Sequence, residues 1–543
     1  MAENIVKIAS EPGIKRDGTK FEGDNYVDGQ WVRFQRGLPR KIGGYRSINK
    51  YLKGVARTLS GYTQDQLTYV HAGSANMVER FYIDGNFNTS VISNRTPPTL
   101  ALNDENLWQF DIETATNPLT GVFTNKLIAQ VAPNLNCICN SFGGQLFIGD
   151  LFGTAPLTEI TNLPTGYSAT GGVVALHPYT FAFGNDGYIM WSVAGDPSDF
   201  TSFGSGSANV ASQKIVRGMP LRGGPGNAPS GLFWSADALI RATFIGGDSV
   251  FQFDTVSTQS SILSAQCVIE YDGVFYWVGV DRFLMFNGVV REVPNNLNIN
   301  FFFDNLNFAQ RQKVFAIKVP RYGEIWWCFP KGDSTEPNHA VIFNLRENTW
   351  YDTALPNDGR AAGIFPTVFN RPLMSGVKPD FEPIGYRITE AGDTRITEDD
   401  NVRITDESGD PRYKFWVHEV GTDEIDGQSL QPIRSYFETG DISLPATQGV
   451  NKALQTLMLE PDFVQSGPLT VQITGRANAR SPEVNGPVMT IVEDPQTPQE
   501  QVIYFKEQRR ELRFRFESNA VGGDYQMGLV LAHIQPGDGT VIG

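Results

Sequence analysis

Cysteine and histidine are scarce in this chain of 543 residues, which has four of the first and five of the second. Cys137 and Cys139 are separated by one residue, too little for a relaxed bridge between them. Cys267 and Cys328 stand in apolar, strand-like surroundings, where a buried and inert thiol is the common role. We therefore expect no disulfide framework, and we expect synthesis in a cytoplasm.

Motifs of the common catalytic and metal sites are also missing. The sequence has no GxxxxGK[ST] phosphate loop, no HExxH helix and no CxxC pair, and its histidines lie far apart. The acidic run "TEDDNVRITDESGD" (397–410) offers oxygen ligands, but its spacing is not that of an EF-hand, so calcium is only a minor alternative. We predict no enzyme, no cofactor and no metal site.

Long apolar runs are absent, since no stretch approaches the roughly 20 apolar residues that cross a membrane. The start, "MAENIVKIASEPGIKRDG", lacks the apolar core of a signal peptide. We expect no membrane span.

Positive charge is in deficit: 44 Lys and Arg face 59 Asp and Glu, for a net charge of −15. This balance argues against wrapping nucleic acid by counterion release, but it does not exclude a passage that DNA slides through. Residues 1–57 are the exception, with twelve bases against six acids. These bases either lie on a solvated loop or dock an acidic partner, and the candidate contacts are Lys15, Arg16, Arg36 and Arg40.

Short alternating strands joined by Gly and Asp-Gly turns are what the sequence has in abundance. Between residues 61 and 375 they recur in units of about 40–50 residues, the length of a four-stranded propeller blade. Asp272-Gly273 and Asn287-Gly288 are strong hairpin pairs. The pattern predicts an all-β chain with a six-bladed β-propeller over 61–375, preceded by a basic extended segment, 1–60, that joins it. A stack of ordinary β-sandwich domains is the alternative.

Residues 431–543 show a different alternation and predict a separate C-terminal β-sandwich. In "ELRFRFES", Leu512, Phe514 and Phe516 would face a core, while Arg513 and its alternating neighbours would face water.

Between these modules, residues 376–430 form an acidic insertion in which the triplet Arg-Ile-Thr occurs three times at a period of eight. So few apolar groups per unit cannot bury a core. We expect the units to become ordered as short stacked strands at an assembly contact, with a disordered linker as the alternative. The candidate contacts are Arg387, Ile388, Arg395, Ile396, Arg403 and Ile404.

Several ordered stretches together resemble a known family. They are "GIKRDGTKFEGDNYVDGQWVRFQRGLPRKIGGYRSI" (13–48), "MWSVAGDPSDFTSFGSGSANVASQKIVRGMPL" (190–221), and "VFAIKVPRYGEIWWCFPKG" followed by "HAVIFNLRENTWYD" (314–352). The set is similar to the tail nozzle, or tail hub, of short-tailed bacterial viruses, also called the packaged-DNA stabilisation protein. The Arg-Ile-Thr insertion departs from the plainest members.

The resemblance implies a structural virion protein rather than an enzyme. It implies a hexameric ring below the portal and an adaptor, located in the virion tail. Such a ring retains the packaged genome, touches double-stranded DNA transiently, and anchors needle, fibre or spike proteins. The alternative is a propeller that binds or degrades carbohydrate, which would need convergent carboxylates and aromatic platforms in one cleft.

Deleting residues 387–410 tests the role of the repeat. The propeller should stay folded, whereas ring assembly or spike attachment should weaken, because three aligned isoleucines can each contribute ~1.5–3 kcal/mol when buried against a neighbour. Electron microscopy and infectivity assays measure the outcome. Full assembly and infectivity after the deletion would show that the repeat is a spacer.

Overall fold

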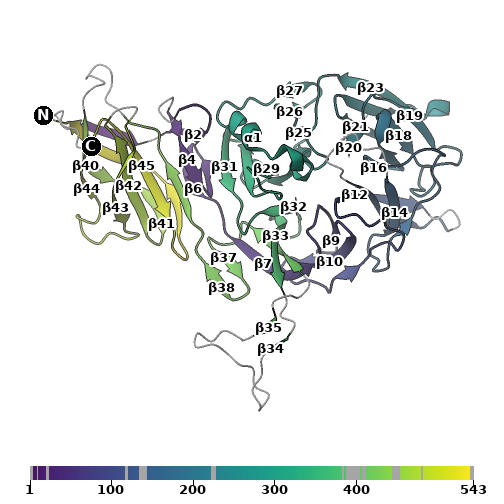
Figure 1. Ribbon diagram of the computed structural model, residues 1–543, viewed down its shortest axis with the longest axis horizontal. Coiled ribbons are helices and arrows are strands. Elements are labelled where there is room, and N and C mark those ends of the chain that lie inside the picture. The colour runs from purple at the N-terminus through teal and green to yellow at the C-terminus, as the bar shows by residue number, and fades with distance from the viewer. Residues whose placement is uncertain are drawn as a thin grey trace, which may run out of the picture.

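The computed structural model describes residues 4–8, 10–19, 24–116, 120–133, 143–221, 228–381, 385–386, 404–406, 411–442, 453–477 and 481–537. Strands make up 55% of the described residues and helices 4%, so this part of the chain is all-β with many small sheets. Its one described α-helix is α1 (Ile299–Asn305). Figure 1 shows two bodies, with both described ends of the chain in the smaller one.

Six antiparallel four-stranded sheets follow one another between Thr58 and Ala354, each made of four consecutive strands. The first three comprise β8 (Thr58–Gln64), β9 (Leu67–Ser74), β10 (Met77–Asp84) and β11 (Ser93–Asn94); β12 (Asn106–Thr116), β13 (Phe123–Pro133), β14 (Gln145–Asp150) and β15 (Thr158–Glu159); and β16 (Gly172–Leu176), β17 (Tyr179–Phe183), β18 (Tyr188–Trp191) and β19 (Gly206–Asn209). The next three comprise β20 (Ile215–Pro220), β21 (Ser230–Ser235), β22 (Leu239–Phe244) and β23 (Phe251–Ser257); β24 (Ile269–Tyr271), β25 (Val274–Val278), β26 (Phe283–Phe286) and β27 (Val290–Glu292); and β28 (Phe315–Val319), β29 (Glu324–Phe329), β30 (His339–Asn344) and β31 (Thr349–Ala354).

A seventh sheet draws its strands from distant parts of the chain. Its order is β32 (Arg360–Ile364), β33 (Leu373–Phe381), β36 (Pro411–His418), β7 (Tyr45–Leu52), β37 (Glu424–Asp426) and β38 (Ser429–Gln431). β7 comes from the N-terminal segment and pairs antiparallel with β36. We call these seven sheets the seven-sheet body.

The first strands of most successive sheets are neighbours in space. β8 contacts β12, β12 contacts β16, β16 contacts β20, β24 contacts β28, β28 contacts β32, and β32 contacts β8 again. Figure 1 shows the sheets set around a common centre. Near that centre the backbones approach closely, since a Cβ on Gly171 would lie 1.9 Å from the carbonyl oxygen of Ile215.

Aromatic pairs pack successive sheets against one another. The ring centroids of Phe183 and Phe233 are 5.5 Å apart between the third and fourth sheets, and those of Trp234 and Trp277 are 5.7 Å apart between the fourth and fifth. Phe81 of the first sheet lies 5.0 Å from Phe415 of the seventh. Such tilted and edge-on pairs add packing energy beyond the area that they bury.

The smaller body, which we call the terminal body, contains three further sheets. Their orders are β1 (Asn4–Ile8), β47 (Val530–Pro536), β40 (Leu454–Glu460) and β44 (Ile503–Arg509); β4 (Asp28–Gln30), β39 (Ser435–Glu438), β45 (Glu511–Ser518), β42 (Leu469–Arg476) and β43 (Val484–Ile491); and β41 (Phe463–Ser466), β46 (Asp524–Met527), β6 (Leu38–Lys41) and β5 (Val32–Gln35). The inward positions Leu512, Phe514 and Phe516 are buried as predicted. The prediction that Arg513 faces water is wrong, because its side chain is fully buried beside Asp441.

The sequence predicted a separate terminal module. In the structure, the terminal body shares an apolar core with the rest of the chain. One apolar cluster includes Tyr26 and Trp31 of the N-terminal segment, Trp326 of the sixth sheet, and Phe437 and Phe514 of the terminal body. The N-terminal segment therefore fills the space between the two bodies, and all three share a core.

Of the three Arg-Ile-Thr units, only part of the third is described. β34 (Gly385–Tyr386) pairs antiparallel with β35 (Ile404–Asp406), so the residues just before the first unit lie beside the third unit. Ile404 is in that strand, whereas Arg387, Ile388, Arg395, Ile396 and Arg403 lie outside the described residues.

Candidate functional site: the N-terminal strap

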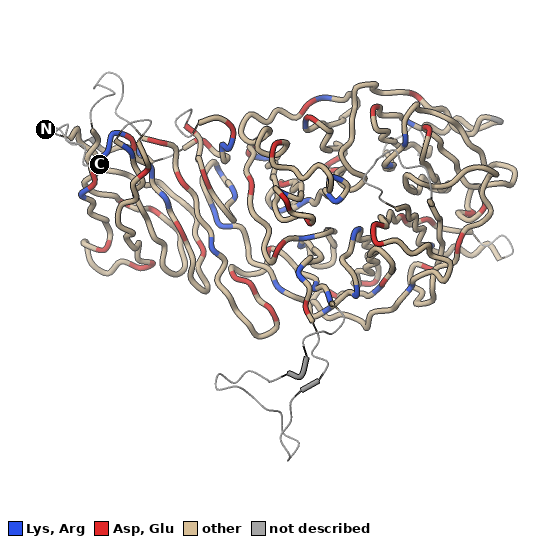
Figure 2. The backbone as a smooth tube through the Cα atoms, in the orientation of Figure 1, with Lys and Arg blue, Asp and Glu red and all other residues tan. Residues whose placement is uncertain are grey.

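The N-terminal segment from Glu11 to Lys41, which we call the strap, runs between the two bodies (Figure 1). Its strands β2 (Glu11–Ile14) and β3 (Asn25–Tyr26) pair in parallel, and β2 contacts β31 of the seven-sheet body. Its strands β4 and β6 pair with β39 and β46 of the terminal body. The strap thus holds one body on each side, and Figure 2 shows cationic residues along it.

Arg33 is the most deeply buried cation of the strap, with 1% of its side chain exposed. Its Nε lies 2.8 Å from Oε1 of Glu324, a fully buried residue of β29. Its Nη1 donates to Glu419, beyond β36, at 2.9 Å. The guanidinium also lies over the Tyr322 ring, 3.6 Å from its centroid. The pKa of Arg33 is raised, because these carboxylates outweigh the effect of burial.

Glu324 is itself held in place by neighbours of the sixth sheet. The Tyr351 hydroxyl donates to it at 2.7 Å and the Trp326 indole at 2.8 Å. A buried carboxylate with these donors and one guanidinium has its lone pairs satisfied, which is the condition for a buried ion pair to be tolerated.

Arg16 makes a second connection. Its Nε donates to Oδ1 of Asp352 in β31 at 2.8 Å, and its Nη1 donates to Asp28 of the strap. His339 Nε2 lies 2.9 Å from the other oxygen of Asp352. Burial alone would raise the pKa of Asp352, but Arg16 and His339 more than offset this and lower it to about 2.

The other candidate cations, Lys15, Arg36 and Arg40, are less buried than Arg33. Lys15 is half-buried, and its backbone N–H donates to Tyr26 O at 2.8 Å. Arg36 is exposed in the β5–β6 turn, where its backbone N–H donates to Glu347. Arg40 donates to the Gln35 amide oxygen at 2.9 Å. The side chain of Arg16 is thus taken up within the chain, whereas Arg36 is presented to solvent.

Acidic residues on either side of the three Arg-Ile-Thr units also form contacts within the chain. Glu424 accepts a hydrogen bond from the Tyr45 hydroxyl at 2.9 Å. Lys414 Nζ lies 2.8 Å from Asp426 and 3.4 Å from Asp380. Part of the acidic flank therefore holds β36 and β37 in place.

A small cavity lies where the first strands converge. It encloses ≈ 60 Å³, about the volume of two water molecules, and amide side chains such as Gln109 and Gln130 line it. Arg57 at its edge is paired with Glu336 at 2.6 Å. Among the lining residues that the structure describes, the charged groups are cations.

Two other kinds of site are absent from the described residues. No group of three or more His, Cys, Asp or Glu side chains in them is placed to hold a metal ion. In the same part of the chain, no helix has the length and apolar character needed to span a bilayer.

Sequence reasoning named Arg16 but missed Arg33, Glu324, Glu419 and Asp352. The partners are about 290–390 residues apart in the chain, and no spacing rule links them. A lone Arg in an alternating strand-like stretch ordinarily indicates a solvent-facing position. Nothing in the sequence around Arg33 therefore indicates that its side chain is buried.

Replacing Arg33 with methionine tests the first connection. The free energy of unfolding should fall by about 3–5 kcal/mol, because Glu324 is left as an uncompensated buried charge. Adding Glu324→Gln should restore part of the loss. Urea unfolding measures both, with Arg36→Met as the control that should change it by less than ~0.5 kcal/mol. Equal effects at the two arginines would contradict the assignment.

Acid titration tests the second connection. Since the folded-state pKa of Asp352 is about 2 against an ordinary value of 3.8, its stabilising effect is present above pH ~4 and is lost as the pH falls towards 2. This contribution is about 2 kcal/mol. Asp352→Asn should flatten the fall in unfolding free energy over that range, whereas Asp254→Asn should not. An unchanged slope in Asp352→Asn would show that the pair does not form.

Comparison with known proteins was made for the whole chain. No protein-family model matches it, and no curated protein matches its sequence.

Proposed function

We propose that this chain is a structural subunit of a tail nozzle, or tail hub, of a short-tailed bacterial virus. In this proposal the seven-sheet body is a β-propeller and the terminal body is a β-sandwich. Several copies, six by the family resemblance, enclose a channel below the portal and adaptor. The protein is made in the host cytoplasm and acts in the virion tail.

The observation that carries the proposal is the strap that joins the two bodies. A wall that retains a packaged genome must not flex between its parts, and interdomain contacts of ordinary size and polarity allow such motion. Here one apolar cluster and the buried pairs of Arg33 and Arg16 connect the two bodies through the strap. This construction suits a rigid wall better than it suits a hinged enzyme.

The proposed propeller rests on the succession of first strands around one centre. The sequence pattern predicted six blades, and six four-stranded sheets of consecutive strands are present. The mixed sheet built on β32, β33, β36 and β7 makes a seventh. A spacing pattern cannot detect this seventh sheet, because its strands come from both sides of the Arg-Ile-Thr units and from the N-terminal segment.

The central cavity limits where DNA can pass. The cavity measures only ≈ 60 Å³, so we place the channel between copies of the chain rather than through a single chain. Such a ring requires heterologous contacts that close by rotation. The net charge of −15 suits a wall with only transient contact to DNA. Adaptor, needle, fibre or spike proteins would bind the rims of the ring.

The alternative, a propeller that binds or degrades carbohydrate at its centre, has less support. Glycoside hydrolysis uses two carboxylates that flank the bond. The described lining of the central cavity instead presents Arg57, Lys214 and several glutamines. A cationic and amide lining is the wrong complement for that reaction.

The assembly is the property to test. Native mass measurement and electron microscopy of tails that contain this protein should find a ring of several copies around an open channel. The expected lumen is acidic or neutral. One or two copies per tail, or a continuous stripe of Lys and Arg along the lumen, would contradict the proposal.

A further inference from the structure

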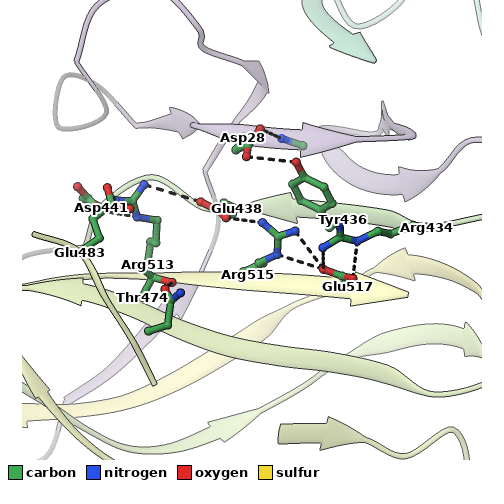
Figure 3. A network of polar contacts seen from close by, with 12 residues as sticks. Asp28, Arg434, Tyr436, Glu438, Asp441, Thr474, Glu483, Arg513, Arg515 and Glu517 are labelled. Atoms are coloured by element: carbon green, nitrogen blue, oxygen red, sulfur yellow. Dashed lines mark hydrogen bonds and ion pairs between the residues drawn. The ribbon is translucent and has the colours of Figure 1, made fainter. Parts of the chain in front are cut away.

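The outer face of the five-stranded sheet in the terminal body carries a groove that the proposed function does not use. Strands β39, β45, β42 and β43 form its floor, and it encloses ≈ 430 Å³. Figure 3 shows the network of polar side chains on this face. The groove lies within the 300–1,000 Å³ range of small-ligand sites.

The charges of the groove cancel. Its lining has two cations, Arg434 and Arg515, and two anions, Glu438 and Glu517. Arg434 donates to Glu517 at 2.7 Å, and Arg515 donates to Glu438 at 2.8 Å and to Glu517 at 3.0 Å. Each charge already has its opposite beside it, so the surface has little net field to attract an ion and favours a neutral ligand.

These pairs also fix the planar groups in space. The Arg515 guanidinium lies 3.6 Å from the centroid of the Tyr436 ring, and the Tyr436 hydroxyl donates to Asp28 at 3.3 Å. Figure 3 shows Arg515 between Glu438 and Glu517. Because little rotamer freedom is left to lose, a ligand that meets these groups binds with a small ordering cost.

The groove retains hydrogen-bonding capacity for a ligand. The Gln472 amide N–H donates to Gly486 O at 2.8 Å, which leaves its carbonyl oxygen as an acceptor. The Asn485 carbonyl oxygen accepts from the Thr474 hydroxyl at 2.9 Å, which leaves its NH₂ as a donor. Within the described residues neither open atom has a protein partner. Both residues line the groove, and an acceptor and a donor in one groove suit hydroxyl groups, each of which donates and accepts.

We propose that this groove binds a neutral oligosaccharide. A protein partner fits less well, because stable protein interfaces are centred on an apolar core. Here the exposed apolar contribution is Val488 at the rim, and the centre is polar. The proposal does not rest on the tail-nozzle function, since the groove is formed within one chain.

Titration calorimetry with the full chain tests the proposal. The probes are hexasaccharides of glucose, mannose and N-acetylglucosamine, with oligogalacturonate as an anionic comparison. We expect binding of at least one neutral probe in preference to the anionic one. The double variant Gln472→Ala/Asn485→Ala should weaken that binding at least tenfold. The control is Gln455→Ala on β40 of another sheet, which should leave it unchanged.

Three results would overturn the proposal. They are no binding of any neutral probe at millimolar concentration by the folded protein, a preference for the anionic probe, and equal affinity in the double variant. Sedimentation of the same proteins covers the remaining case. If the double variant loses self-association instead of sugar binding, the groove is an interface between copies. None of these results bears on the copy number in tails, so failure here and failure of the tail-nozzle proposal remain distinguishable.

Discussion

The buried contact of Arg33 with Glu324 and Glu419 is the constraint on which the arrangement of the two bodies depends. A guanidinium at 1% exposure is tolerated only where its charge is compensated, and here the carboxylates come from β29 and from the residue after β36. The strap can occupy its position only when the sixth and seventh sheets are both in place. Its burial therefore fixes the terminal body relative to the seven-sheet body, with Trp31 and Tyr26 filling the apolar space around it.

Local parts of this fold followed from the sequence, because turn chemistry and alternation act over a few residues. Asp272 and Gly273 adopt positive φ and join Tyr271 to Val274 in a two-residue hairpin, as their types predict. Cys267 and Cys328 are buried free thiols, also as expected. The seventh sheet was missed because β7, β33 and β36 are separated by the whole body or by the insertion, and no local pattern records such pairing.

The charged residues show the same division more sharply. Alternation placed Arg513 on the solvent side of β45, and the strand does point it away from the apolar core. Asp441 and Glu483 then cover it, so the outward face is buried by acids that the pattern could not assign to it. Arg16 was selected as an assembly contact for its charge, yet its partners Asp28 and Asp352 belong to the same chain. Composition reveals that basic and acidic segments exist, but only the tertiary structure determines which charges pair internally, as Arg16 does, and which remain exposed, as Arg36 does.

The pairing of β1 with β47 also sets an order of events during synthesis. Asn4 lies opposite Ile534, so the first described strand has no partner until the chain has been made as far as the last one. The same delay applies to β4, which waits for β39, whereas β6 pairs at once with β5 and gains β46 only later. Contacts so distant in sequence form slowly, because a long loop must close first. The consecutive-strand sheets of the seven-sheet body can fold as they leave the ribosome, while β1 and β4 stay unpaired beside them. A chaperone or a neighbouring nascent chain therefore meets an exposed row of strand edges during that interval, and the terminal body is the last part of the molecule to become protected.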